Sequence, residues 1–163
     1  MTLHPSADLA LLRVNDGAGI FTPFHSVGQI HGAGDGAVAF GYPEDSTTAG
    51  LAPVPRMFRG FVQRVFEHKS HLGYSYVADE LSFPIPQGLS GGPVVFDRNP
   101  WEVVGVAAEV IEASTYVRTI AEVKESGREY YEKVRAVVQH GVAVRLEHVR
   151  AWLDDTVPPA GAA

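Results

Sequence analysis

The chain has 163 residues, of which 45% are hydrophobic and 20% are charged, so it can bury a core and has the composition of one ordinary globular domain. Its formal net charge is −6, and its thirteen Lys and Arg residues form no basic stripe, which argues against nucleic acid as a partner. Because the chain has no cysteine, a disulfide framework and a thiolate zinc site are excluded.

Membrane and export signals are also missing from the printed sequence. The first residues, MTLHP, have neither a basic region nor an apolar run of signal-peptide length. No stretch approaches the ~18 consecutive apolar residues of a membrane-spanning helix. We therefore expect a soluble, cytoplasmic protein with no membrane partner.

Short apolar runs separated by glycine and proline dominate the chain, and this pattern favours a β-rich fold. Runs of this length, rich in Val, Phe and Tyr, predict strands. A set of such strands suits a β-barrel or a β-sandwich. The predicted strands are 9–14, 37–40, 59–67, 75–78, 94–96, 103–110 and 142–146, with a polar hairpin loop at 67–73.

Residues 114–140 allow two interpretations. Tyr130, Tyr131, Val134, Val137 and Val138 fit one face of a helix that would end at the following glycine. The segments 116–125 and 128–138 instead fit two strands around a Ser-Gly pair, and we prefer this hairpin because Ser-Gly between runs rich in Val and Tyr is a turn signal. After it, apolar residues recur at helical spacing over 146–153, which predicts a terminal helix that ends before the Pro-Pro pair at 158–159.

The string GLSGGP at 88–93 is the most specific motif of the chain. A serine that transfers acyl groups needs an exposed hydroxyl on a tight turn and two backbone N–H groups that converge on the developing oxyanion. Gly88 can adopt backbone angles that a side chain would resist, so its N–H and that of Ser90 can point to one place. Gly91 and Gly92 leave room for a substrate.

These residues, with four other passages, resemble the trypsin-like, chymotrypsin-fold serine peptidases, especially the bacterial cysteine-free type. The passage HPSADLALLRV at 4–14 is similar to the strand that carries the triad aspartate in that family, and GYP at 41–43 to the start of its second barrel. VVGV at 103–106 and GVAV at 141–144 resemble later strands of that barrel. The order, aspartate before serine, also fits chymotrypsin-like enzymes better than α/β-hydrolases.

The resemblance implies a mainly β fold, a chymotrypsin-like double β-barrel with a complete second barrel, an incomplete first barrel and a C-terminal helix. It implies peptide-bond hydrolysis through an acyl-enzyme, with a peptide or protein substrate and with no cofactor and no metal. The implied catalytic residues are Ser90 as nucleophile and Asp8 as the carboxylate that orients an imidazole, with the N–H groups of Gly88 and Ser90 as the oxyanion hole. The implied substrate pocket includes Ala107, Gly141 and Ala143, which carry no charge and favour a small or apolar substrate side chain.

The triad histidine is the missing part, because the family places it before the aspartate and only seven residues precede Asp8 here. We expect His4, His25 and His31 to be exposed loop residues, and His140 and His148 to be structural. His68 and His71 suggest a metal pair, but no further ligand follows at a metal-site spacing. We therefore expect this chain alone to be nearly inactive.

Two readings of the function remain open at this point. In the first, the chain is the C-terminal portion of a trypsin-like serine endopeptidase whose histidine lies outside this sequence. In the second, it is a degenerate protease fold that binds peptides or regulates a partner without cleaving. Both readings divide the chain into a first-barrel remnant and crossover at 1–40, a second barrel with the helix at 41–153, and a flexible tail at 154–163. Exposed first-barrel edges would invite self-association or a partner chain.

Overall fold

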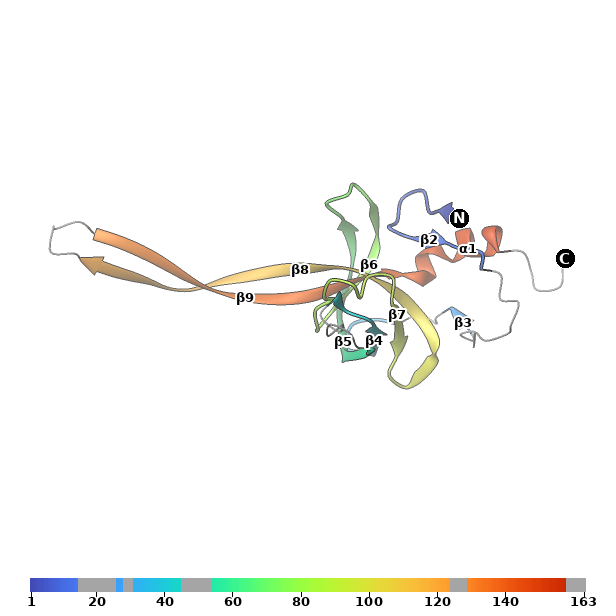
Figure 1. The fold of residues 1–163 in the computed structure, drawn as a ribbon, viewed down its shortest axis with the longest axis horizontal. Helices are drawn as coiled ribbons and strands as arrows, with labels where there is room; N and C mark the ends of the chain where they lie inside the picture. Colours follow the sequence, from blue (N-terminus) through green and yellow to red (C-terminus); the bar gives the residue numbers. More distant parts are fainter. Residues whose placement is uncertain (15–25, 28–30, 45–53, 124–128, 158–163) are drawn as a thin grey trace.

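The computed structural model describes residues 1–14, 26–27, 31–44, 54–123 and 129–157 and is mainly β, with one α-helix near its C-terminal end (Figure 1). A compact body holds both ends of the described chain, and a long two-stranded ribbon projects from it. The elements in order are β1 Thr2–Leu3, β2 Ala10–Leu11, β3 Ser26–Val27, β4 Gly36–Gly41, β5 Arg56–Lys69, β6 Ser75–Leu81, β7 Pro93–Phe96, β8 Asn99–Val123, β9 Glu129–Arg145, a 3-10 helix Leu146–Val149 and α1 Arg150–Thr156.

Six of the strands close into a ring. The sheet order β8-β7-β4-β5-β6-β9 is completed by pairing of β9 with β8, and every one of these pairs is antiparallel. The two-residue strand β3 adds to the outside of this order, parallel to β8. Each ring strand therefore has a neighbour on both sides over part of its length, which reduces the number of unpaired N–H and C=O groups that an open sheet would expose.

The interior of the ring is an apolar cluster to which all six strands contribute. Its members include Ala39 of β4, Val62 of β5, Leu81 of β6, Phe96 of β7 and Ala143 of β9, each no more than 2% exposed. Side chains of successive strand residues point to opposite faces, so Val142 and Val144, on either side of Ala143, belong to a second cluster outside the ring.

The second cluster is covered by the two ends of the chain. Ala7, which is 1% exposed, and Leu9 come from the N-terminal segment, and Leu146, Val149 and Leu153 come from the 3-10 helix and α1. The amide of Ser75, at the start of β6, donates to the carbonyl oxygen of Ser6 at 2.9 Å and ties the N-terminal segment to the ring. The apolar periodicity of 146–153 is thus explained by burial of one helical face against β9 and β6.

The hairpin preferred for 114–140 is confirmed, and the helical alternative is wrong. β8 and β9 pair antiparallel without interruption of the ladder from Gly105↔Arg145 to Val123↔Glu129, apart from two register shifts on β8. The predicted Ser-Gly turn itself lies outside the described residues. We call the part of this hairpin beyond the ring, residues 110–140, the arm; it projects well beyond the body in Figure 1.

The other predicted strands are present with changed limits. The first, predicted over 9–14, is only the two residues of β2, because its described partner is the two-residue β1. β5 continues to Lys69, so the hairpin loop predicted at 67–73 begins three residues later than expected. The terminal helix is confirmed, but its first turn, Leu146–Val149, is a 3-10 helix.

His31 corrects one expectation, because it is buried and not an exposed loop residue. Its Nε2 lies 2.6 Å from a carboxylate oxygen of Asp79, whose other oxygen accepts from Arg145 at 3.0 Å. The same Arg145 donates to the carbonyl oxygen of His31 at 2.6 Å and to Glu147 at 2.7 Å. A buried carboxylate requires partners of this kind, and the network fixes the segment before β4 against β6 and β9.

Among the described residues, no helix is long and apolar enough to cross a membrane.

Candidate functional site

The GLSGG string forms a tight turn between the interior cluster and β7. The amide of Leu89 donates to the carbonyl oxygen of Pro86 at 3.0 Å, and that of Gly92 to Leu89 at 2.9 Å. The amide of Gly91 donates to Ala107 on β8 at 2.8 Å. Gly88 has φ +86° and Gly91 has φ +87°, a region in which L side chains are strained. The turn therefore requires glycine at both positions.

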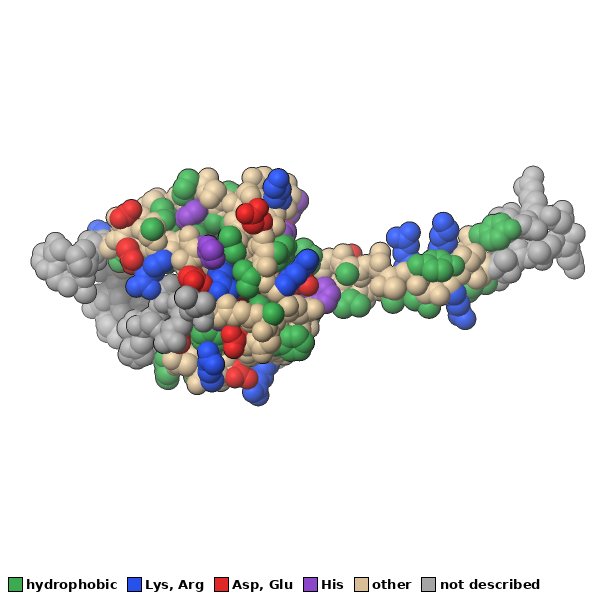
Figure 2. Space-filling view, turned by 180° about the vertical axis from the view of Figure 1, so that it is seen from behind, with side chains coloured by type: hydrophobic (Ala, Val, Ile, Leu, Met, Phe, Trp, Pro, Cys, Tyr) green, Lys and Arg blue, Asp and Glu red, His purple; other side chains and the backbone are tan. Residues whose placement is uncertain are grey.

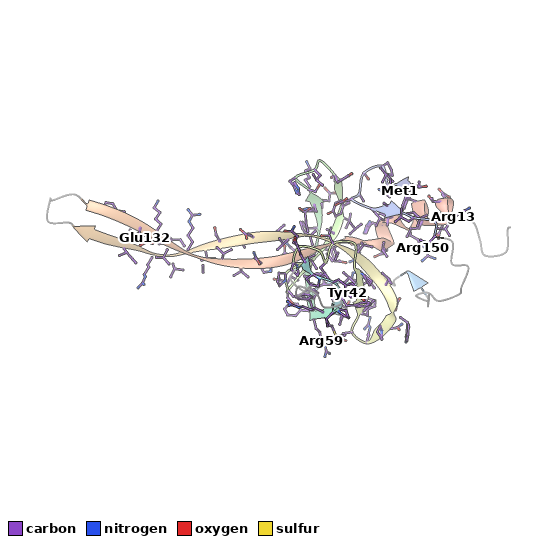
Figure 3. The ribbon with its side chains drawn as sticks, in the orientation of Figure 1. Met1, Arg13, Tyr42, Arg59, Glu132 and Arg150 are labelled. Atoms are coloured by element: carbon purple, nitrogen blue, oxygen red, sulfur yellow. The ribbon has the colours of Figure 1, made fainter. Side chains whose placement is uncertain are left out.

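The turn is anchored to the GYP motif that follows β4. A Cβ on Gly88 would lie 2.7 Å from the amide nitrogen of Glu44 and 3.1 Å from the carbonyl oxygen of Tyr42. The amide of Glu44 donates to the carbonyl oxygen of Gln87 at 2.9 Å. The Leu89 side chain, 1% exposed, packs so closely on Gly41 that a Cβ there would lie 2.8 Å from it. The GYP motif and the GLSGGP string, which are separate in sequence, thus form one structural unit. Figure 3 labels Tyr42 of the GYP motif.

Ser90 lies at the exposed tip of this turn. Its Oγ donates to the carbonyl oxygen of Ala108 on β8 at 2.6 Å. The amides of Leu89, Gly91 and Gly92 all donate to backbone carbonyls, whereas within the described parts of the chain no acceptor is found for the amides of Gly88 and Ser90. Gly88 and Ser90, two exposed residues on either side of the buried Leu89, are therefore the residues of this string whose backbone amides have no described acceptor.

Asp8 is exposed and lies on the outer side of the ring, between the buried Ala7 and the half-buried Leu9. The nearby Ser6–Ser75 backbone bond holds its segment at the start of β6. Its carboxylate is close enough to Tyr76 on β6 to raise the pKa of that hydroxyl. In the described structure Asp8 and Ser90 make no direct hydrogen bond, and the Ser90 hydroxyl donates to Ala108 instead.

Glu109 on β8 is a further charged residue near the Ser90 turn, and no sequence motif selected it. It follows Ala108, whose carbonyl accepts from Ser90, at a register shift in β8. Its carboxylate contacts His68 Nε2 at 2.5 Å and His71 Nδ1 at 3.4 Å. His68 is 8% exposed and lies on β5, so its expected place in the hairpin loop is wrong. Packing of its ring between Phe66 and Tyr76 explains the burial.

Tyr76 lies beside this group. Burial raises the pKa of the Tyr76 hydroxyl well above its usual value, and the carboxylates of Glu109 and Asp8 raise it further. The Tyr76 oxygen has no hydrogen-bond partner of good geometry among the described residues. Tyr76 therefore stays a neutral phenol across the physiological pH range. Only the tertiary structure reveals this cluster, because its members come from β5, β6 and β8.

None of the described histidines is hydrogen-bonded to the Ser90 hydroxyl. His4 Nδ1 accepts from the amides of Ser6 and Ala7, and its ring meets Trp152 edge-on at 4.9 Å between centroids, so His4 shapes a turn and is only partly exposed. His140 contacts Gln63, and His148 is exposed in the 3-10 helix. His25 lies outside the described residues. Among those that are described, no group of three or more His, Asp or Glu residues is arranged to hold a metal ion.

The residues predicted to form the substrate pocket lie deeper than a surface pocket. Ala107 and Ala143 are 1% and 0% exposed and belong to the interior cluster. Gly141 lies against Ile85, where a Cβ would be 2.7 Å from that side chain, so Ile85 occupies the space in front of Gly141. A cavity of about 270 Å³ opens beside Ile85, at the base of the arm; it is lined by Arg56, Phe58, Pro84, Ile85, Pro86, Gln87, Val110 and Gln139.

A comparison with known protein families identifies the family of this chain. The model of the trypsin-like peptidase domain matches residues 1–106, which include Asp8, the GYP motif and the whole GLSGGP string. The chain therefore belongs to the trypsin-like peptidase domain family. Its described architecture is a closed six-stranded antiparallel ring with a C-terminal helix. No curated protein matches the chain, and the arm lies outside the matched residues.

Proposed function

We propose that this domain hydrolyses peptide bonds through an acyl-enzyme on Ser90, with an imidazole that residues beyond the printed sequence supply. The observation that carries the proposal is the turn itself. In a member of a peptidase family, an exposed serine hydroxyl stands beside two backbone N–H groups that have no acceptor in the described structure. Donors aimed at the oxyanion of acyl transfer are the largest single contribution to such catalysis.

The roles follow from this geometry. Ser90 Oγ attacks the carbonyl carbon of the scissile bond while the imidazole takes its proton, and the carbonyl oxygen becomes an oxyanion that accepts from the amides of Gly88 and Ser90. Collapse of this intermediate breaks the C–N bond, and the imidazolium gives its proton to the leaving amine. Water then attacks the acyl-enzyme by the same route and releases the acid and free Ser90. Asp8 orients the imidazole and stabilises its charged form.

The fold also supports a division of the chain into parts of two barrels. We propose that the ring is the second of two barrels and that residues 1–40 are the remnant of the first. The exposed apolar side chains Leu3, Leu12 and Val14, each more than 60% exposed, support this, because they would pack against further strands of a first barrel. An imidazole from such strands would enter between Asp8 and Ser90, over Ala108 and Glu109.

The three pocket residues support a preference for a small or apolar substrate side chain. Ala107, Gly141 and Ala143 carry no charge, and Ile85 occupies the space in front of Gly141. A long basic or acidic side chain would have no buried partner there.

The direct test is chemical rescue. The chain is treated with a fluorophosphonate probe, with and without free imidazole, and labelling of Ser90 is read by mass spectrometry. We expect little labelling without imidazole and a rise of at least tenfold with it, since a lone serine is a poor nucleophile. Ser90→Ala removes the label, and Ser114→Ala on the arm is the matched control that keeps it.

Two outcomes would contradict the proposal. Absence of labelling at all imidazole concentrations, with the fold intact by circular dichroism, would show that Ser90 cannot act as a nucleophile. Equal labelling of Ser90 and Ser114 would show that its environment gives no activation.

A second candidate function is a peptide-binding module that does not cleave. One observation favours it: the Ser90 hydroxyl is held by the Ala108 carbonyl, and each described histidine has another partner or lies elsewhere. A binder would retain peptides with equal affinity in the parent and in Ser90→Ala, and would show no rescue by imidazole. A peptidase would show rescue, and Ser90→Ala would abolish it.

A further inference from the structure

The arm carries apolar side chains that are more than half exposed. Tyr116 and Val117 on β8 are 56% and 54% exposed, and Tyr131, Val137 and Val138 on β9 are 65%, 55% and 51% exposed. Figure 2 shows hydrophobic side chains along the arm with Lys and Arg between them, in a part of the molecule that touches no other element in that view. An isolated two-stranded ribbon is at best marginally stable in water, so exposed apolar residues on it call for a partner.

Exposed apolar side chains lie on both faces of the arm. Val137 pairs with Ser114 and Val138 with Ala113, and since successive side chains point to opposite faces, one valine is exposed on each. A single flat surface packed on one face would leave the other uncovered. A partner that continues the ribbon sideways, as a third strand, shields side chains on both faces at once.

The charge of the arm differs from that of the body. Residues 110–140 contain as many acidic as basic residues, five of each, so the net charge of −6 belongs to the rest of the chain. The charged residues of the arm are Glu112, Arg118, Glu122, Lys124, Glu125, Arg128, Glu129, Glu132, Lys133 and Arg135. A segment without net charge does not repel a second copy of itself, whereas two bodies of this charge repel each other, so the arm is the part of the chain best suited to contact another copy.

The two edges of the arm are not equivalent. On β8, Val117 is an extra residue at a register shift, and such a bulge twists an edge away from further pairing. On β9 the residues from Glu129 to His140 follow one another in the ladder without a shift. Its outer edge beyond the β6 pairing, which ends at Gly141, is a regular row of backbone donors and acceptors.

We propose that the arm is a dimerisation element, and that two copies of the chain pair antiparallel through the β9 edges of their arms. At about 3.3 Å per residue the ribbon beyond the ring is roughly 45 Å long. A stable interface uses about 20–30 residues from each partner, and the arm is of that size. Antiparallel pairing keeps the two acidic bodies at opposite ends, and it leaves the Ser90 turns of both copies open.

The test measures oligomeric state, so its result does not depend on whether Ser90 is catalytic. Light scattering after size exclusion should give the mass of a dimer for the full chain. The double variant Val137→Asp/Val138→Asp places a carboxylate on each face of β9 and should raise the dissociation constant by at least about tenfold. Leu72→Asp, at an equally exposed apolar position in the β5–β6 turn, should leave the mass unchanged.

A second measurement does not rely on a variant that could disturb the arm. Because the chain has no cysteine, single cysteines at Tyr131, Lys133, Arg135 and Val137 can report contact between identical residues of two copies. In an antiparallel pair, disulfide formation should peak at one position, near the two-fold axis, and decline on both sides of it.

A monomer at the highest workable concentration would overturn the proposal. A dimer that persists in Val137→Asp/Val138→Asp, with no cross-linking at any of the four arm positions, would also overturn it. That result would locate the contact on another surface, such as the exposed apolar residues of the N-terminal segment. Equal cross-linking at all four positions would also overturn the proposed arrangement.

Discussion

The strands β8 and β9 each run through two different environments, and the contrast separates what pairing does from what packing does. Within the ring, Ala107 and Ala143 are almost completely buried and face the interior cluster. In the arm the same two strands continue their ladder with no core on either face, and most side chains are exposed. The β8–β9 pairing continues through both regions, but only in the ring do β7 and β6 pair with the other edges of these strands and does a core cover one face, so we expect the ring to be the more stable region.

The largest expected difference is for a truncation in the ring compared with one in the arm. Phe96 is 2% exposed, and its ring meets His31 edge-on. Phe96→Ala should lower the free energy of unfolding by about 3–5 kcal/mol, since it removes a buried aromatic side chain and leaves a cavity. Tyr116→Ala in the arm should change it by less than about 0.5 kcal/mol. Urea unfolding at the lowest workable protein concentration measures both, and equal effects would mean that the arm is part of the cooperative core.

A buried and an exposed ion pair of the body provide a second contrast, in which we expect a similar difference in the free energy of unfolding. Asp79→Ala removes the buried carboxylate that contacts both His31 and Arg145 and should cost about 3–5 kcal/mol. The pair between Arg59 and Asp97 has the same chemistry at the surface, with the arginine side chain 70% exposed. Asp97→Ala should therefore cost at most about 1 kcal/mol. Chemical denaturation of the two variants checks the ranking, which a larger loss for Asp97→Ala would contradict.

The Ser90 turn should be more sensitive to added volume than other glycine turns. Gly73→Ala, with φ +90° and open space around it, should cost only the backbone strain of roughly 1–2 kcal/mol. Gly88→Ala adds a contact with the backbone of Tyr42 and Glu44, and overpacking of this kind costs about 1–3 kcal/mol more. The same variant should also reduce imidazole-dependent labelling of Ser90, while Gly73→Ala should not. Thermal unfolding and probe labelling measure the two effects separately.

The smallest effect concerns pH and the N-terminal segment. Burial lowers the pKa of His4 below its usual value of 6.5, and its unprotonated Nδ1 accepts two backbone N–H groups. At a pH between the lowered native pKa of His4 and 6.5, the unfolded state therefore binds more protons than the native state. The stabilisation is complete above about pH 6.5 and is lost as pH falls through the native pKa of His4.

Hydrogen exchange of the amides of Ser6 and Ala7 should show this loss, with faster exchange at acidic pH after correction for intrinsic rates. His4→Asn is the matched variant, because the asparagine oxygen can still accept a backbone N–H two residues on but does not titrate. Retention of the same pH dependence in His4→Asn would contradict the role given to this imidazole.

Local signals in the sequence determined a good part of this protein. Short apolar runs between glycine and proline located most strands, and the hairpin preferred at 114–140 is confirmed by the β8–β9 pairing, because turn chemistry and strand composition act over a few neighbouring residues. The GLSGGP string likewise defined a turn in which Gly88 and Gly91 take backbone angles suited only to glycine. These features depend on backbone sterics, which a short segment specifies by itself.

Only the tertiary structure decided which distant residues meet. His31 is buried because Asp79 and Arg145, far along the chain, form its partners, and His68 is buried because β6 and β8 bring Tyr76 and Glu109 beside it. Likewise, the extent of β5 and the isolation of the arm follow from which strands find neighbours in the ring. Burial and charge pairing are sums over contacts between separate segments, and no local pattern of residues contains them.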